Sequence, residues 1–189
     1  MNRPATLLVL LLAGLLAGCG GGSRPTGIRA AETPADDVAE YQPRWRSHTV
    51  DSTQYRKVFL AGTIDMGRSA DWQAALVARF RDSIGGRWLF FNPRRREFHA
   101  SPAEMEYQVA WELAHLEAAD LIVMNLLGDS RSPISLLEMG LYARSGKLFV
   151  ACSPDYYRYD NVRITCRRYG VPLYDSLTAL LDDLPQQSD

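Results

Sequence analysis

From Lys57 onward, short apolar runs alternate with longer, more polar segments, and this alternation limits the possible folds more than any other feature. Runs this short and this apolar are typical of strands that are buried on both faces. We expect five strands, at residues 58–61, 88–91, 121–126, 148–152 and 171–174. Because parallel neighbours need crossover connections, which place helices on the faces, the pattern predicts a parallel sheet covered on both sides.

Helix signals fill the intervals between the apolar runs. Residues 101–104 read Ser-Pro-Ala-Glu, a capping box with Pro102 at the first helical position. Ser132 and Pro133 open another helix, and Gly146 closes it because glycine readily takes the left-handed conformation of a helix end. The predicted helices cover residues 69–84, 101–118, 132–146 and the stretch from Asp175, as its cap, to just before Pro185.

The expected fold is an α/β three-layer sandwich of the flavodoxin-like or Rossmann-like kind, with a five-stranded parallel sheet. In such folds ligands bind at the carboxyl ends of the strands, near the point where the strand order reverses. Functional residues are therefore expected in the loops that follow the predicted strands. These loops are residues 62–68, 92–100, 125–132 and 153–161.

The first 19 residues predict export of the protein. Arg3 precedes an apolar run at residues 7–16, which is too short to span a bilayer but suits the core of a signal peptide. The sequence Leu-Ala-Gly-Cys then ends at Cys19, which resembles the bacterial lipoprotein processing site. We expect a lipid on Cys19 to hold the exported protein at a bacterial membrane, on its periplasmic or extracellular face. The alternative is an ordinary signal-peptidase site with Cys19 as an unrelated thiol.

Residues 20–55 have the composition of a flexible tether. Three glycines follow Cys19, and a run rich in Pro, Ala and Asp extends to about Tyr55 without sustained helical or strand periodicity. The globular domain is therefore expected to occupy residues 56–189.

Composition excludes several kinds of partner. The formal net charge is −1, so a general attraction to a nucleic-acid polymer is not expected. The three histidines and three cysteines show neither HxxxH nor CxxC spacing, which argues against a metal site. The turn from Gly62 to Gly67 is not a GxGxxG fingerprint, and we expect no cofactor. Cys152 and Cys166 are interpreted as buried free thiols, with a disulfide as the alternative.

One carboxylate lies in an otherwise apolar helix and is the first candidate for chemistry. Glu138 shares its helix face with residues three and four positions away, of which only Ser135 is polar. Desolvating a carboxylate costs several kcal/mol unless it is paired or protonated, and unpaired buried acids concentrate at functional sites. Its apolar neighbours are Ile134, Leu141 and Tyr142.

Polar residues after the first two strands are further candidates. Backbone amides and a carboxylate follow the first strand, although a plain strand-to-helix turn has the same appearance. Arginines follow the second strand, where they can bind a phosphate or carboxylate through forked hydrogen bonds, or can simply be solvated. The candidates are Gly62, Thr63 and Asp65 after the first strand, and Asn92, Arg94 and Arg95 after the second.

Two helices add polar candidates. Ser132 marks a helix amino end, whose unpaired amides and partial positive charge suit a phosphate, and the serine can also act as a simple cap. Gln108, Glu112 and His115 form a polar stripe on the preceding helix, for which a solvated face is the alternative.

Six segments together resemble the nucleoside 2-deoxyribosyltransferase-like family and cover most of residues 57–184. The resemblance implies that Glu138 is the nucleophile that attacks the anomeric carbon of a sugar. It also implies that Glu112, eight residues before Asp120, contacts the base or leaving group, as a candidate general acid. The segments are VFLAGTIDMG, DWQ, NPRR, WELAHLEAADLIVMN, SPISLLEMGLYARSGK and NVRITC.

The implied chemistry is cleavage of an N-glycosidic bond. A carboxylate traps the oxocarbenium-like sugar covalently while a proton donor helps the base to depart. The expected substrates are 2-deoxynucleosides or their 5′-monophosphates, and the sugar passes to another base or to water. The alternatives are a non-catalytic module that binds a nucleotide-like ligand and a surface domain for a protein partner.

The resemblance leaves the phosphate preference open. Ser132 stands six residues before the nucleophile, where relatives that hydrolyse 5′-monophosphates carry a serine and nucleoside-transferring relatives carry an acid. Asp65 argues the other way, because a carboxylate repels a nearby phosphate. Relatives commonly complete the site with a second subunit, which implies a homo-oligomer, with Asn161 as a candidate for such a contact or for sugar recognition.

Overall fold

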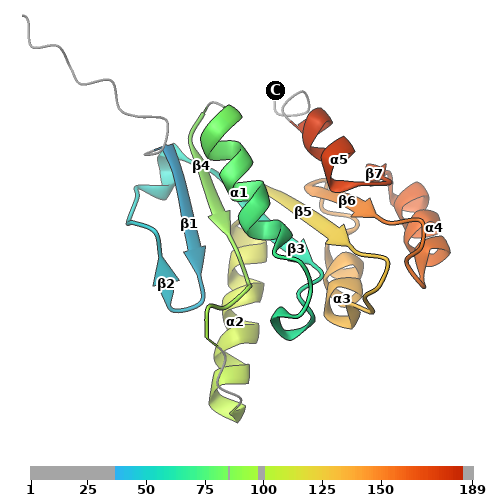
Figure 1. Ribbon diagram of the computed structural model, residues 1–189, viewed down its shortest axis with the longest axis horizontal. Helices are drawn as coiled ribbons and strands as arrows, with labels where there is room; N and C mark the ends of the chain where they lie inside the picture. Colours follow the sequence, from blue (N-terminus) through green and yellow to red (C-terminus); the bar gives the residue numbers. More distant parts are fainter. Residues whose placement is uncertain (1–36, 85, 98–100, 185–189) are drawn as a thin grey trace, which may run out of the picture. The chain divides into compact units, whose positions relative to one another are not determined.

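The computed structural model describes residues 37–84, 86–97 and 101–184. These residues form a seven-stranded sheet with helices on both faces (Figure 1). The strands are β1 (Val38–Gln42), β2 (Trp45–Arg46), β3 (Arg56–Gly62), β4 (Trp88–Phe91), β5 (Leu121–Leu126), β6 (Leu148–Cys152) and β7 (Leu173–Tyr174). The helices are α1 (Trp72–Ser83), α2 (Pro102–Ala118), α3 (Pro133–Tyr142), α4 (Tyr159–Tyr169) and α5 (Leu177–Asp183), with 3₁₀ turns η2 (Ser52–Gln54) and η3 (Asp65–Gly67).

The strand order is flavodoxin-like. The sheet runs β2-β1-β4-β3-β5-β6-β7, and all neighbouring strands are parallel except β1 and β2. The chain leaves β3 toward one edge to form β4 and returns past β3 to form β5. The order therefore reverses between β3 and β5, where such folds place their ligands. The predicted fold class is confirmed, and the carboxyl ends of β3 and β5 define the switch point.

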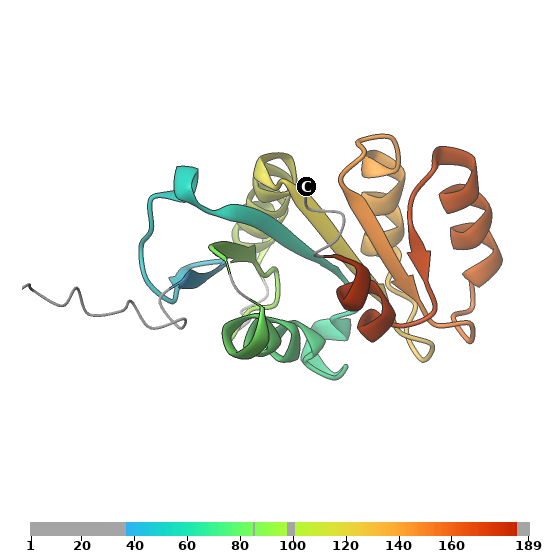
Figure 2. The ribbon, with the colours of Figure 1, turned by 90° about the horizontal axis from the view of Figure 1, so that it is seen from above.

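Two apolar layers attach the helices to the sheet. One layer joins α2, α3 and α4 to one face and includes Leu116, Met139 and Phe59. The other joins α1 and α5 to the opposite face and includes Phe80 and Leu60. Figure 2 shows the two groups of helices on opposite sides of the sheet. Phe59 and Leu60 are adjacent on β3 and point to opposite faces, as the two-residue period of a strand requires.

The prediction that residues 38–55 belong to a tether is wrong, because β1 and β2 are part of the sheet. β1 pairs in parallel with β4, and Val38 lies opposite Trp88. The sequence does not reveal this strand, because β1 is short and contains the polar Glu40 although it is buried on both faces. Glu40 tolerates burial since the side chains of Asn92 and Gln42 donate to it. The sheet therefore already includes Val38, so the folded part does not begin at residue 56. The sheet has seven strands rather than five.

The predicted signal peptide, the lipidation site Cys19 and the tether residues 20–36 lie outside the described residues. Within the part of the chain that the structure describes, no helix has both the length and the apolar content needed to cross a bilayer.

Helix α4 was not predicted, because its sequence is mostly polar. Only Val162 and Cys166, four residues apart, are buried on it, and they pack toward the sheet. The cap of α5 also differs from the prediction. The side chain of Ser176, not Asp175, accepts a hydrogen bond from the amide of Ala179 at 3.2 Å.

Cys152 and Cys166 are buried free thiols, so the disulfide alternative is excluded in this structure. Burial raises the pKa of Cys152 to about 12 and that of Cys166 to about 11. Both side chains therefore remain thiols at neutral pH and act as small core residues.

Candidate functional site

A glycine lets β3 and β5 approach closely at the switch point. Gly62 has a φ of +122°, and a Cβ atom there would lie 2.2 Å from the backbone oxygen of Asn125. Any larger residue would force the strands apart. The next residue, Thr63, donates its amide to the same oxygen at 2.9 Å. Gly62 therefore contributes through the backbone and brings Thr63 to the end of β5.

A chain of hydroxyl groups connects the two strand ends. Thr63 Oγ1 lies 2.8 Å from Ser132 Oγ, which lies 2.7 Å from Ser130 Oγ. Ser130 Oγ donates to Asp65 Oδ1 at 2.9 Å. The structure thus brings together Thr63, Asp65 and Ser132, three of the predicted residues, in what we call the hydroxyl chain. Ser130 was not predicted, because a lone serine in a polar loop carries no signal of its own.

The backbone around the hydroxyl chain is strained. Asp65, Met66 and Ser132 have φ values of 50°, 54° and 41°, in the left-handed region that such residues rarely adopt. Among the described residues, Arg44 is the only other non-glycine residue with positive φ. Each such conformation costs on the order of 1–3 kcal/mol, and they concentrate at functional sites. The strain therefore supports this edge of the sheet as a candidate binding site.

Ser132 precedes α3 but its side chain does not cap the helix. The hydroxyl group makes no bond to an α3 amide and lies instead between Thr63 and Ser130. Pro133 follows at the first helical position, where its missing N–H costs nothing. Of the two interpretations of Ser132, the side-chain cap is wrong, and phosphate binding stays a prediction.

Glu138 lies in the second turn of α3 and is only 8% exposed. Across the described residues, no hydrogen bond or ion pair reaches its carboxyl group. Burial, followed by the nearby charge of Glu112, raises the pKa of Glu138 to about 8. At neutral pH the ligand-free protein therefore keeps this carboxyl group mostly protonated.

Glu112 on α2 is the acid whose charge acts on Glu138. Burial raises the pKa of Glu112, while a hydrogen bond from Gln108 and the charge of Arg95 lower it. The bond from Gln108 Nε2 to Glu112 Oε1 measures 2.6 Å. Two interacting carboxyl groups resist double ionisation, so we treat Glu112 and Glu138 as a glutamate pair whose titrations are coupled. Glu112 therefore belongs to the candidate site and not to a solvated helix face.

Gln108 holds Glu112 through a hydrogen bond, and Arg95 in turn holds Gln108. Arg95 Nε donates to Gln108 Oε1, and its terminal nitrogens donate to Glu104 Oε2 at 2.8 Å and to the Glu104 carbonyl at 3.1 Å. Because arginine is only a donor, Gln108 turns its amide oxygen to Arg95 and its NH₂ group to Glu112 and the carbonyl of Pro93. Arg95 binds Glu104 and Gln108 and fixes the orientation of Gln108, and its contact with a ligand stays a prediction.

Asn92 and Arg94 have protein partners. Asn92 Nδ2 donates to Glu40 Oε1 at 2.8 Å, and Asn92 Oδ1 accepts from the amide of Arg94. The buried Arg94 side chain donates to Ser69 Oγ at 2.9 Å and to Gln73 Oε1 at 3.2 Å. These bonds tie the loop after β4 to the start of α1. Direct ligand contact by either residue stays a prediction without support from this geometry.

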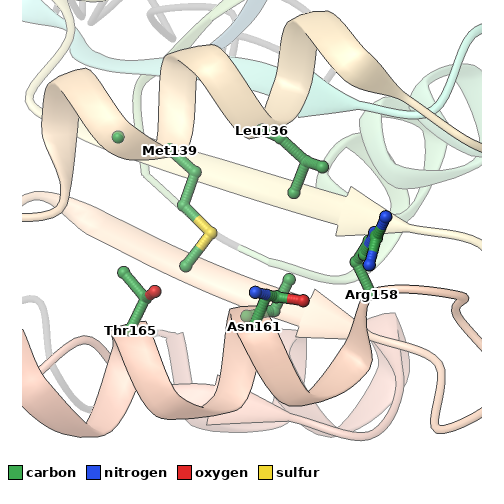
Figure 3. A pocket seen from close by; sticks show the side chains of 7 residues that line it. Leu136, Met139, Arg158, Asn161 and Thr165 are labelled. Atoms are coloured by element: carbon green, nitrogen blue, oxygen red, sulfur yellow. The ribbon is translucent and has the colours of Figure 1, made fainter.

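A groove of about 300 Å³ lies between α3 and α4, and Figure 3 shows side chains of both helices facing it. Glu138 is not among the residues that line this groove. Its charge interacts with Glu112 of α2, whereas the neighbouring Met139 points toward α4 (Figure 3). Asn161 lines the groove and is therefore not brought together with Glu138 within one chain. The lining residues are Leu136, Met139, Gly140, Arg158, Asn161, Val162 and Thr165.

The site contains the two groups that glycosyl transfer requires. The glutamate pair, with Glu138 protonated at neutral pH, has the residue types that can act as a nucleophile and a proton donor. Nowhere in the described ranges do three His, Cys, Asp or Glu side chains gather in a way that could hold a metal ion.

Comparison with known proteins agrees with the resemblance found in the sequence. A family model described as nucleoside 2-deoxyribosyltransferase like matches residues 55–156, which is more than half of the chain. The match includes Asp65, Glu112 and Glu138, and it excludes β1, β2 and Asn161. No curated protein matches the chain. The match over most of the sheet and both acids of the pair shows that the chain belongs to the nucleoside 2-deoxyribosyltransferase-like family.

Proposed function

We propose that the protein cleaves the N-glycosidic bond of 2′-deoxynucleosides or of their 5′-monophosphates through a covalent ester on Glu138. The observation that carries the proposal is the environment of this carboxyl group, which is buried beside Glu112 and has no hydrogen-bond donor among the described residues. An acid with a purely structural role would have donors around it. The family supports deoxyribosyl transfer or glycosidic cleavage as the reaction class.

The first step forms the ester. An oxygen of Glu138 bonds to the anomeric carbon while the bond from that carbon to the base breaks, and its electron pair leaves with the base nitrogen. Glu112 gives a proton to the departing base. Because Gln108 occupies Oε1 of Glu112, the transferable proton belongs on Oε2.

The second step releases the sugar. A nitrogen of another base, or a water oxygen, attacks the anomeric carbon, and the bond to Glu138 breaks with return of its electron pair to the carboxylate. Glu112 takes the proton of the incoming group, which restores the starting state. A base as acceptor makes the protein a transferase, and water makes it a hydrolase.

The glutamate pair has the right number of protons for this cycle. Reaction needs Glu138 charged and Glu112 protonated, whereas the pKa of about 8 keeps a proton on Glu138 when no ligand is bound. A base that hydrogen-bonds to Glu112 favours movement of the proton from Glu138 to Glu112. Substrate binding would thereby generate the nucleophile.

The same raised pKa favours one alternative, a binding module without turnover. A protonated Glu138 is a hydrogen-bond donor, and a neutral buried acid can recognise a polar ligand without attacking it. In that case the pair would bind a nucleotide-like ligand and would leave the glycosidic bond intact.

We also propose that the protein is exported and anchored to a bacterial membrane through a lipid on Cys19. This proposal rests on the sequence of residues 1–19 alone. Mass spectrometry of the membrane-extracted protein should find acyl groups on Cys19, and an unmodified cleaved terminus would contradict the anchor.

A homo-oligomer is a further part of the proposal, with a protein partner as the alternative. Exposed apolar side chains on α2 and α3 support either kind of contact. Light scattering of the full-length protein in detergent measures the assembly, and a monomer at all concentrations would contradict the homo-oligomer. The side chains are Met105, Val109 and Leu113 on α2, and Ile134, Leu137 and Leu141 on α3.

The function is tested by incubating the full-length protein with deoxynucleosides and their monophosphates and measuring free base by chromatography. We expect base release, and we expect Glu138→Gln to reduce it at least about a thousandfold, because the amide cannot form the ester. Glu106→Gln, at an exposed position on α2, is the matched control and should retain activity. Ligand-induced thermal stabilisation without base release would favour the binding module instead.

A further inference from the structure

The hydroxyl chain has only one possible direction. Each hydroxyl group donates one hydrogen bond, and Ser130 uses its proton on Asp65. Ser132 must therefore donate to Ser130, and Thr63 must donate to Ser132. Thr63 in turn accepts from the amide of Leu127 at 3.1 Å. All three hydroxyl protons consequently point along the chain toward Asp65.

Asp65 is the end of the chain that a ligand can reach. Thr63, Ser130 and Ser132 are buried, whereas Asp65 is half-buried. Ser130 donates to one carboxylate oxygen, and within the described part of the chain the other oxygen has no hydrogen-bond donor. Because the hydroxyl protons are already used, a ligand at this edge finds no hydroxyl donor in the chain and meets the negative charge of Asp65, beside the amides at the amino end of α3.

We propose that Asp65 is a specificity-determining residue that selects a substrate with a free 5′-hydroxyl group over a 5′-monophosphate. This inference rests on the proposed function and decides between its two substrate classes. A 5′-hydroxyl donates to the free oxygen of Asp65. A phosphate brings acceptor oxygens and a second negative charge, which the carboxylate repels.

The distance along α3 between Glu138 and the hydroxyl chain suits a single sugar bound between them. Ser132 and Glu138 are six residues apart, so their backbones lie about 9 Å apart along the helix axis. In the orientation that we propose, a deoxyribose with its anomeric carbon at Glu138 extends toward the amino end of α3, where Ser132 and Ser130 meet Asp65. The hydroxyl chain therefore lies on the side that the 5′ position would occupy.

The groups that could attract a phosphate at this edge contribute less than the repulsion between the phosphate and Asp65. The amino end of α3 has a partial positive charge, which a full carboxylate charge beside it outweighs. Arg68 and Arg131 are the arginines nearest in sequence to Asp65 and Ser130, and both are exposed to solvent. Water and salt screen such exposed charges, so they contribute little to holding a phosphate.

The test measures kcat/KM of the full-length protein for a 2′-deoxynucleoside, its 5′-monophosphate and its 5′-deoxy analogue. We expect the nucleoside to exceed both by about tenfold or more, because a site built around a hydroxyl rejects ligands that lack one. Asp65→Asn keeps the oxygen that accepts from Ser130 and tolerates the left-handed backbone. It should reduce the preference for the nucleoside over the monophosphate at least about tenfold. Asp129→Asn, at an exposed position next to Ser130 in the loop after β5, is the matched control and should leave the preference unchanged.

Calorimetric titration with the same three compounds separates this inference from the proposed function. Base release with a preference for the monophosphate, or an Asp65→Asn variant with unaltered preference, would overturn the role of Asp65 and leave the reaction intact. Selective binding of the nucleoside without base release would support Asp65 while the reaction fails. Absence of both binding and turnover would overturn both.

Discussion

Glu40 and Glu138 are equally buried, at 8% exposure each, but their surroundings differ completely. Glu40 on β1 accepts from Asn92 at 2.8 Å and from Gln42 at 3.0 Å, and Arg81 lies 4.0 Å away. In the described residues, Glu138 has no donor, and the charge of a second acid, Glu112, acts on it. Burial alone therefore does not identify a functional carboxylate. Burial without donors makes Glu138 the stronger candidate, because a structural role requires donors.

Among these tests, we expect the largest effect from removal of the second acid, Glu112. Glu112→Gln keeps the shape of the side chain but cannot give a proton to the base, so we expect kcat to fall by about 10²–10⁴. Steady-state rates of base release measure the effect, and substrates whose bases leave easily should lose less. Glu117→Gln, at an exposed position on the same helix, is the control. Equal losses for good and poor leaving groups would contradict a general-acid role.

The pH dependence of stability tests the raised pKa of Glu138. Between the ordinary value near 4.5 and about 8, the folded protein keeps a proton that the unfolded chain releases. The free energy of unfolding should therefore fall as pH rises through this range, by up to about 1.4 kcal/mol per pH unit from this group. Glu138→Gln should remove this contribution in denaturant titrations. A difference between wild type and variant that is constant with pH would show that Glu138 is not protonated by burial.

Leucine substitutions of the two buried acids should have opposite signs. Glu40→Leu leaves the NH₂ groups of Asn92 and Gln42 without their acceptor, and should lower the free energy of unfolding by about 1–3 kcal/mol. Glu138→Leu removes a buried acid that has no donor, and should raise the free energy of unfolding by about 1–2 kcal/mol at pH 8. Chemical denaturation at one pH measures both free energies of unfolding. Two losses of similar size would contradict the difference that we infer between Glu40 and Glu138.

The smallest expected effect is at Arg95. Arg95→Lys removes the Nε donor that orients Gln108, so Glu112 is held less firmly and kcat should fall about threefold to tenfold. The bell-shaped pH profile of kcat should shift as well, because the bond from Gln108 lowers the pKa of Glu112. Arg96→Lys, at an exposed position that stacks on Trp45, is the control. A stability loss without a change in the pH profile would make Arg95 merely structural.

The fold and its central acid were predictable because their signals are local. Apolar runs identified β3 to β7, and one charge in an apolar helix identified Glu138. Strand β1 was not predictable, because the burial of its polar Glu40 depends in part on a hydrogen bond from Asn92, 52 residues away. The same limit applies to the site. The hydrogen bonds of Arg94 to Ser69 and Gln73, residues far from it in the sequence, could not be predicted from its own loop, and its contact with a ligand stays a prediction.

The most direct test of the central claim is mass spectrometry of the full-length protein during turnover of a 2′-fluorinated deoxynucleoside. Fluorine destabilises the oxocarbenium-like state and slows release of the sugar, so a covalent intermediate should accumulate. We predict a mass increase equal to one fluorinated sugar, located by peptide mapping on Glu138. Base release without any adduct, or an adduct on another residue, would contradict the account.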